Sequence, residues 1–208
     1  MTEELLYDIR DGIGHIVLSR PHARNALTFP MYERLAEIAA NPGGARALIL
    51  TGTGRAFSAG GDRDILANIA AGTLPPNTHA LLGQIHVNTI KTMLSLEIPV
   101  IAAVPGCAVG YAAGLVALCD QVVMGASAFL SDPHVQYGIP ATSAAQLIWP
   151  RQCPELSARE ILMTGRKAMA EEALRLGLWN RVAGGGEGRK GALERDELVA
   201  HPPPNGGA

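Results

Sequence analysis

Runs of consecutive apolar residues alternate along this chain with segments in which apolar residues recur every three or four positions. Apolar runs bounded by glycine, proline or aspartate are typical of strands covered on both faces, and they occupy residues 47–50, 100–104 and 122–124. Residues 5–19 alternate more loosely around Asp11-Gly12, a pair that supplies the left-handed backbone of a tight hairpin turn. Two antiparallel strands are therefore predicted at the N-terminal end.

Helical spacing predicts the elements between these strands. Thr28 is expected to cap a first helix that has Pro30 in its first turn and an apolar face formed by Met31, Leu35, Ile38 and Ala39. Further helices are predicted over residues 62–71, 79–96, 111–118, 143–149, 155–164 and 170–176. Residues 73–78, with two consecutive prolines, are predicted to form a loop. This alternation indicates right-handed β-α-β crossovers and an α/β fold with a mostly parallel sheet flanked by helices.

The composition fits a single domain without a strongly charged partner. The chain has 208 residues, of which 48% are hydrophobic and 17% charged, and its net charge of −2 gives no reason to expect nucleic acid as a ligand. Cys107, Cys119 and Cys153 lack the spacing of a metal or redox motif, so reduced thiols in a cytoplasmic protein are predicted. The acidic N-terminus does not resemble a secretory signal.

Two stretches determine the predicted limits of the folded domain: one long enough to cross a membrane and one rich in glycine and proline. Residues 98–119 carry no charge and are long enough to span a bilayer, but Pro105-Gly106 in their middle favours a strand, a turn and a buried helix. Residues 183–208 contain seven glycines and three consecutive prolines without helical periodicity. We therefore expect a folded core over residues 1–182 and a disordered tail over residues 183–208.

Two loops between a buried strand and a helix have the composition of oxyanion-binding loops. In the first, residues 57–62, small residues allow close backbone approach and the free amides of a helix start attract a negative oxygen. The second, residues 105–111, follows the next crossover. Plainer interpretations are that Asp62 only caps a helix, and that Gly106, Gly110 and Gly114 only allow close packing.

Several short motifs occur in an order that is specific even though each alone is weak. They are Arg24-Asn25-Ala26-Leu27, residues 57–62, residues 99–104 followed by Gly106 and Gly110, Cys119-Asp120, residues 132–138 and residues 162–165. With these motifs the chain resembles the crotonase (enoyl-CoA hydratase/isomerase) superfamily from residue 5 to residue 182.

The resemblance implies a crotonase-like fold of repeated β-β-α turns and an acyl-CoA substrate, with coenzyme A as part of that substrate and no separate cofactor. The thioester carbonyl would accept hydrogen bonds from the backbone amides of Gly61 and Tyr111, which makes an enzyme of the lyase or isomerase type the expectation. The implied substrate-binding residues are Arg24, Ala26, Ala59, Gly60, Gly61, Asp62, Arg63, Asp64, Ile65, Gly110, Tyr111, Pro133 and Ser143. No metal is expected, because neither His79 with His86 nor Asp132 with His134 has a third ligand at a suitable spacing.

The chain departs from the family at the acid/base positions. Hydratases of the family use two glutamates, but Gly114 and His134 stand at these positions. Glycine transfers no proton, so His134 is the predicted acid/base, unless it is only a structural histidine. Relatives that cleave β-diketones also have a histidine here, supported by an aspartate nine residues on, where this chain has Ser143.

Three functions follow from these departures. They are an acyl-CoA enzyme that works through an enolate, a β-diketone (retro-Claisen) hydrolase that uses His134, and a catalytically silent family member. The family also implies a homotrimer or a dimer of trimers, completed by C-terminal helices. Because the residues after Val182 are rich in glycine and proline, we expect a shortened C-terminal helical region and weaker assembly, which sedimentation would test.

Overall fold

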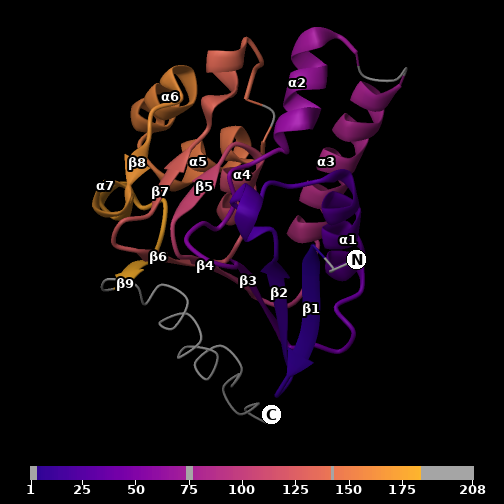
Figure 1. Cartoon of the computed structure of the whole chain (residues 1–208). Coiled ribbons are helices and arrows are strands. Elements are labelled where there is room, and N and C mark those ends of the chain that lie inside the picture. Colours follow the sequence, from indigo (N-terminus) through magenta and orange to yellow (C-terminus); the bar gives the residue numbers. More distant parts are fainter. Residues whose placement is uncertain (1–3, 74–76, 142, 184–208) are drawn as a thin grey trace.

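A six-stranded sheet forms the base of the molecule in the computed structural model, which describes residues 4–73, 77–141 and 143–183 (Figure 1). The first two strands pair antiparallel, and every other neighbouring pair is parallel. In spatial order the strands are β1 (Leu5–Arg10), β2 (Ile13–Leu18), β3 (Ala47–Gly52), β4 (Val100–Val104), β6 (Gln121–Gly125) and β9 (Arg181–Ala183). The mostly parallel sheet is thereby confirmed.

The predicted N-terminal hairpin is present. Arg10 pairs with Ile13, and the two residues between them, Asp11 and Gly12, have φ angles of 53° and 82°. Such left-handed values at both central positions belong to the turn whose twist matches that of the flanking strands. The Asp-Gly pair is therefore the feature that closes β1 onto β2.

A second, three-stranded sheet was not predicted from the sequence. It consists of β5 (Cys107–Val109) parallel to β7 (Phe129–Ser131), which pairs antiparallel with β8 (Ala168–Met169). Strands of two or three residues are too short to show alternation, so the pattern gave no signal for them. This small sheet is important for the site because β5 carries the second loop and β7 leads into the segment with His134.

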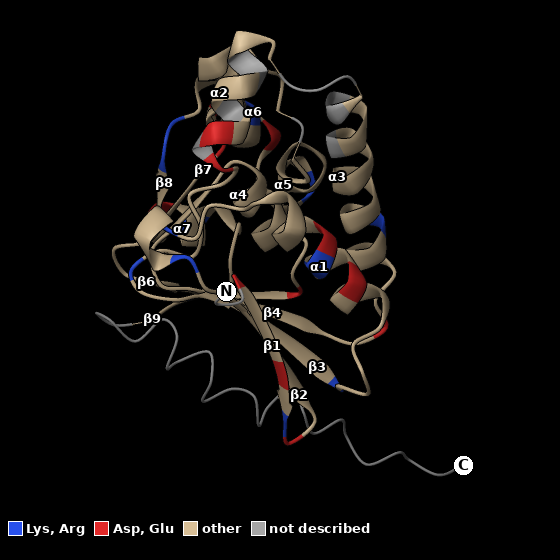
Figure 2. Ribbon diagram, turned by 45° about the vertical axis from the view of Figure 1, so that its right-hand side comes forward, with Lys and Arg blue, Asp and Glu red and all other residues tan. Residues whose placement is uncertain are grey.

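The helices lie within a few residues of their predicted limits, on one side of the six-stranded sheet (Figures 1 and 2). They are α1 (Phe29–Ala40), α2 (Arg63–Ala71), α3 (Thr78–Leu94), α4 (Tyr111–Ala117), α5 (Ala145–Gln152), α6 (Glu155–Thr164) and α7 (Ala170–Leu176), with two 3₁₀ helices at Pro21–Ala23 and Pro133–Tyr137. Charged residues of both signs are scattered over the fold (Figure 2). None of the described helices is long and apolar enough to cross a membrane, and residues 98–119 contribute to β4, β5 and α4.

One predicted cap is wrong in its detail. Thr28 does precede α1, and Met31, Leu35, Ile38 and Ala39 are buried as expected. The Thr28 hydroxyl, however, makes no capping bond and donates instead to the Glu4 carboxylate at 2.7 Å. The Thr28 hydroxyl thus bonds to Glu4, the residue before β1, instead of capping α1.

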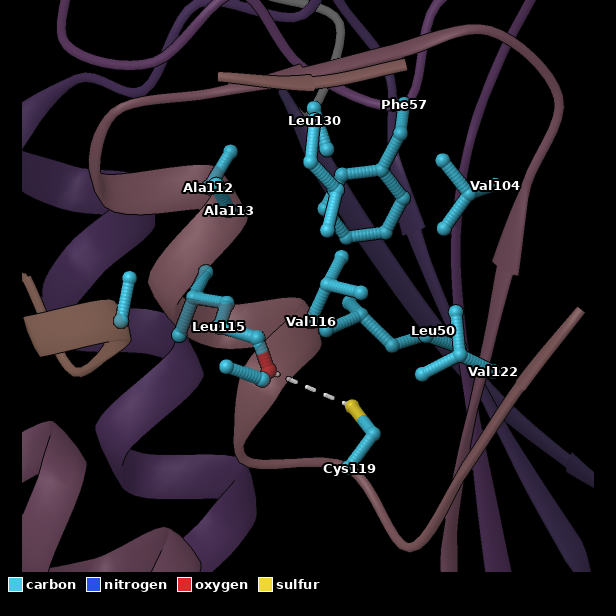
Figure 3. Packing of buried hydrophobic residues seen from close by; sticks show 14 of the residues in the cluster. Leu50, Phe57, Val104, Ala112, Ala113, Leu115, Val116, Cys119, Val122 and Leu130 are labelled. Atoms are coloured by element: carbon cyan, nitrogen blue, oxygen red, sulfur yellow. Dashed lines mark hydrogen bonds between the residues drawn. The ribbon is translucent and has the colours of Figure 1, made fainter. Parts of the chain in front are cut away.

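The main core lies between the sheet and the helices, where alternate residues of β3 and β4 meet α1, α4 and α5. Phe57 is fully buried, and its ring points among Leu50, Val104, Val116 and Leu130 (Figure 3). A buried aromatic side chain of this size contributes about 1.5–3 kcal/mol by burial. Phe57 therefore anchors the first loop to the core immediately before the residues predicted to bind an oxyanion.

Residues 74–76 of the predicted loop, and residues 184–208 of the predicted tail, lie outside the described residues.

Candidate active site

Two loops leave neighbouring parallel strands and are joined by backbone hydrogen bonds. The first loop follows β3 and the second follows β4, its neighbour in the sheet. The amides of Phe57 and Ser58 donate to the Cys107 carbonyl at 3.1 and 3.0 Å, and the amide of Val109 donates to the Ser58 carbonyl at 3.1 Å. The positions of both loops are thus fixed relative to each other by main-chain bonds rather than by side chains.

Glycines allow these loops to touch. A Cβ atom at Gly106 would lie 1.8 Å from the Arg55 carbonyl oxygen, and one at Gly60, whose φ is +92°, would lie 2.7 Å from the Val109 carbonyl oxygen. Neither position has room for a side chain. The close backbone approach predicted for a ligand is therefore, at these two glycines, an approach of one loop to the other.

Two backbone amides at the junctions have no partner. Three neighbouring amides are used: Gly60 donates to the Ser58 hydroxyl at 3.1 Å, Asp62 to the Leu27 carbonyl at 3.1 Å and Gly110 to the Ser131 carbonyl at 2.8 Å. Within the described part of the chain, the N–H groups of Gly61 and Tyr111 have no acceptor. Because buried amides are nearly always paired, these two are available to a ligand.

Both residues line one cavity of about 150 Å³. The predicted site residues that line it are Ala59, Gly60, Gly61, Ile65, Gly110, Tyr111, Pro133 and His134. Residues that the sequence reasoning missed complete the wall, namely Tyr32, His86, Val109, Tyr137 and Ile139. Tyr32 and His86 come from α1 and α3, whose packing against α4 no local motif revealed.

Other predicted residues lie outside this cavity. Ala26 is buried beside the first loop, Arg63 begins α2 and Asp64 is exposed on it. Asp62 accepts a bond from the amide of Asp64 at 3.0 Å, as its interpretation as a helix cap requires, and pairs with Arg20 at 2.8 Å. Burial tends to raise the pKa of Asp62, but the Arg20 hydrogen bond and charge hold it below its ordinary value.

His134 is held by an aspartate that sequence reasoning considered only as a metal ligand. Asp132, which is fully buried, accepts a hydrogen bond from Nδ1 of His134. The Ser143 hydroxyl donates to the other Asp132 oxygen at 2.6 Å. Burial tends to raise the pKa of Asp132, but hydrogen bonding to His134, the nearby imidazole charge and the Ser143 bond hold it below its ordinary value. Ser143, which stands where the β-diketone hydrolases have an aspartate, therefore supports Asp132, and Asp132 supports the ring.

The remaining ring nitrogen of His134 lies near Gly110, the residue before Tyr111. A Cβ atom built on Gly110 would lie 3.5 Å from Cε1 and 3.9 Å from Nε2 of His134, so this edge of the ring rests against the residue before Tyr111. Asp132 occupies Nδ1, which leaves Nε2 for a ligand. A titratable side chain therefore lies against the residue that precedes the unpaired amide of Tyr111.

Gly114, where the family resemblance implies the other glutamate, has no room for a side chain. Gly114 is buried in α4, and a Cβ atom there would lie 2.8 Å from both the Ala144 nitrogen and the Ser143 Cβ. A glutamate at this position would displace the start of α5. Gly114 thus allows close packing, as the plainer interpretation held for this glycine, and contributes no group to the cavity.

A second hollow carries positive charge. Arg24, which was predicted to bind substrate, lies with Arg55 and Lys167 around a space of about 610 Å³ at the Cys107 end of β5. In the described residues none of these three cations has a carboxylate partner. Burial raises the pKa of the Cys107 thiol, while the charges of Arg24 and Lys167 oppose that rise.

The mostly parallel sheet flanked by helices matches solved structures of the crotonase superfamily, to which the chain belongs. Within it, the chain belongs to the enoyl-CoA hydratase/isomerase family, whose sequence model matches residues 8–205. The chain is 32% identical to the carnitinyl-CoA dehydratase of Proteus mirabilis over 98% of its own length and 77% of that protein.

Solved structures agree with this assignment. An enoyl-CoA hydratase/isomerase from Mycobacterium paratuberculosis has a TM-score of 0.88 and 33% identity, and the match covers 98% of this chain and 81% of that one. An enoyl-CoA hydratase from Bacillus anthracis has a TM-score of 0.86 and 27% identity, with 95% and 77% of the two chains covered.

Proposed function

We propose that this protein binds an acyl-CoA thioester and stabilises its enolate between the backbone amides of Gly61 and Tyr111. The observation that carries the proposal is the pair of unpaired N–H groups at one cavity of about 150 Å³. When a proton leaves the carbon next to the thioester carbonyl, negative charge gathers on the carbonyl oxygen. Each positioned donor then lowers the barrier by roughly 2.7–4 kcal/mol.

His134 is the group that moves the proton in this proposal. Nε2 takes a proton from the carbon beside the carbonyl, or returns one to it, while Asp132 holds the ring through Nδ1 and stabilises the imidazolium that forms. One histidine takes the place of the two glutamates of the hydratases, because Gly114 at the other glutamate position has no side chain to transfer a proton. The proposed chemistry is therefore proton transfer at the enolate carbon rather than hydration by two glutamates.

The cationic hollow supports coenzyme A as the carrier of the acyl group. Arg24, Arg55 and Lys167 offer three positive side chains without carboxylate partners in the described residues, at the opposite end of β5 from the cavity. Phosphate groups are natural partners for such side chains. In the proposal the nucleotide phosphates lie toward this hollow and the acyl group enters the cavity.

A parallel assay of two variants tests the proposal. A panel of acyl-CoA thioesters and cyclic β-diketones is assayed for turnover with the wild type, His134→Ala and His22→Ala, whose histidine is exposed away from the cavity. Thioester turnover is expected to fall about 10²- to 10⁴-fold in His134→Ala and to persist in His22→Ala. Unchanged turnover in His134→Ala would remove the proposed role of this residue, and absence of turnover on every compound would favour a silent family member.

A β-diketone hydrolase is the second candidate, favoured by the Asp132–His134 pair. A histidine supported by a carboxylate can activate water for attack on a ketone, and the amide pair then receives the negative oxygen. Turnover of a cyclic β-diketone without retention of the protein on a coenzyme A affinity matrix would select this function over the first.

A further inference from the structure

Three aromatic rings form a compact cluster at the wall of the cavity. The rings of His86 and Tyr111 stack with centroids 4.1 Å apart and planes 26° apart. Tyr32 meets both edge-on, at 5.0 Å from His86 and 4.8 Å from Tyr111. Tyr111 is only 4% exposed, so its side chain forms part of the wall while its amide serves the proposed oxyanion site.

Two polar atoms of this cluster are buried without a partner. They are Nε2 of His86 and the hydroxyl oxygen of Tyr111, and no described residue forms a hydrogen bond with either. The Thr89 hydroxyl lies near enough to the phenol to oppose the rise of its pKa, but it donates its hydrogen to the Ile85 carbonyl at 2.9 Å and so is not a donor to the phenol oxygen. Buried polar atoms without partners are rare, and leaving them unpaired destabilises the fold.

The two atoms belong to neutral groups. Burial lowers the pKa of His86 to about 4, with the nearby His134 acting in the same direction, so the imidazole is uncharged at neutral pH. Burial raises the pKa of Tyr111 to about 12, so the phenol keeps its hydrogen. None of the described residues that line the cavity is lysine or arginine. This wall therefore suits a neutral oxygen and disfavours a carboxylate, which would be buried without a cation.

We propose that the acyl group taken by this cavity carries a second neutral oxygen function, a carbonyl or hydroxyl, which forms hydrogen bonds with Nε2 of His86 and the Tyr111 hydroxyl. This inference rests on the proposed acyl-CoA function. The phenol oxygen lies at the far end of the ring from the amide of the same residue, so the second oxygen stands several bonds beyond the thioester carbonyl. A cavity of about 150 Å³ is small beside the roughly 300–1,000 Å³ of common ligand sites, which limits the acyl group to a short chain.

Matched saturated thioesters test the inference without requiring turnover. Calorimetric titration compares pentanoyl-CoA with 4-oxopentanoyl-CoA, and hexanoyl-CoA with 5-oxohexanoyl-CoA. In at least one pair the oxo thioester is expected to bind about tenfold more tightly, because it satisfies two atoms that the alkyl chain leaves unpaired. Tyr111→Phe and His86→Phe are expected to abolish that preference while retaining affinity for the alkyl thioester.

A neighbouring tyrosine provides the control. Tyr137 lines the same cavity but is 66% exposed, so Tyr137→Phe is expected to leave the ratio of affinities unchanged. If both oxo thioesters bind as tightly as their alkyl counterparts or more weakly, the inference is overturned while the proposed acyl-CoA function stands. Failure of all four thioesters to bind would overturn the proposed function together with it. A preference that persists in both Tyr111→Phe and His86→Phe would show that other atoms recognise the oxygen, which also overturns the inference.

Discussion

The two sides of the cavity are built from different parts of the chain. On the amide side, the N–H groups of Gly61 and Tyr111 come from loops held together by main-chain bonds such as those of Phe57 and Val109. On the proposed acid/base side, His134 is held by the side chain of Asp132, which is held in turn by the side chain of Ser143, and these three side chains form the relay. A main-chain donor is kept when its side chain is replaced, so the aromatic side chain of Tyr111 can line the cavity while the N–H group of the same residue stays available. A side-chain relay changes its chemistry with a single substitution.

Among the variants that leave His134 in place, the one that removes an amide should have the largest effect. Gly61→Pro lacks the N–H group, and kcat is expected to fall about 10²- to 10³-fold through loss of one oxyanion donor. Gly61→Ala retains the N–H, and Gly61 does not adopt a positive φ, so this variant is the matched control. Steady-state kinetics, with thermal unfolding as a check on folding, measures the difference. Equal rates in the two variants would show that the amide of Gly61 is not a donor to the reacting oxygen.

The relay is tested by neutralising its buried carboxylate. Asp132→Asn is expected to lower kcat by about tenfold or more, but by less than His134→Ala, because the imidazole remains while its orientation and the stabilisation of its charge are weakened. Asp11→Asn, on an exposed residue of the β1–β2 turn, is the control and should retain full activity. A value of kcat for Asp132→Asn equal to that of the wild type would assign Asp132 a purely structural role.

This contrast also explains what the sequence could predict. Five strands of the large sheet, the helices and both amide loops follow from local periodicity and from glycines at strand ends, and their expected places agree with the structure. The role of Asp132 escaped prediction because spacing alone does not say which partner a histidine selects, and the Asp-x-His pair was weighed only as a metal site and rejected for want of a third ligand. A proline that follows Asp132 and opens the 3₁₀ helix at Pro133–Tyr137 was the available signal, since it returns the chain toward the aspartate.

Residues from distant helices were beyond local reasoning. Tyr32 belongs to α1 and His86 to α3, and only tertiary packing brings them to the cavity wall. The second sheet was missed for a related reason, because β8 has two residues and pairs with a strand almost forty positions earlier. Local sequence patterns predict single helices and strands, but they do not predict which distant elements come into contact.

The tight packing at Gly114 gives a prediction on stability. Gly114→Ala places a Cβ atom 2.8 Å from the Ala144 nitrogen, so the junction of α4 and α5 must shift, at an expected cost of about 1–3 kcal/mol in the free energy of unfolding. Gly83→Ala is the matched control: it also lies in a helix, α3, but its Cβ would meet nothing within 4 Å. That change is expected to stabilise the protein by about 0.5–1 kcal/mol. Urea unfolding of both variants decides whether the α4–α5 junction is as tightly packed as the distances indicate.

The smallest expected effect is a pH dependence of stability caused by Asp132, which the backbone amides of the other side cannot produce because they do not titrate. Because the pKa of Asp132 in the folded protein lies below the unfolded value of about 3.9, its contribution to stability is present above that value and is lost as the pH falls through the folded pKa. The difference in unfolding free energy between the wild type and Asp132→Asn should therefore be greatest above about pH 4 and should narrow at lower pH. Asp62 and Glu172, whose pKa values are also lowered, are present in both proteins, so their contributions cancel in this difference. Urea unfolding from pH 3 to pH 7 measures it, and a difference that stays constant over this range would mean that Asp132 gains nothing from its charged partners in the relay.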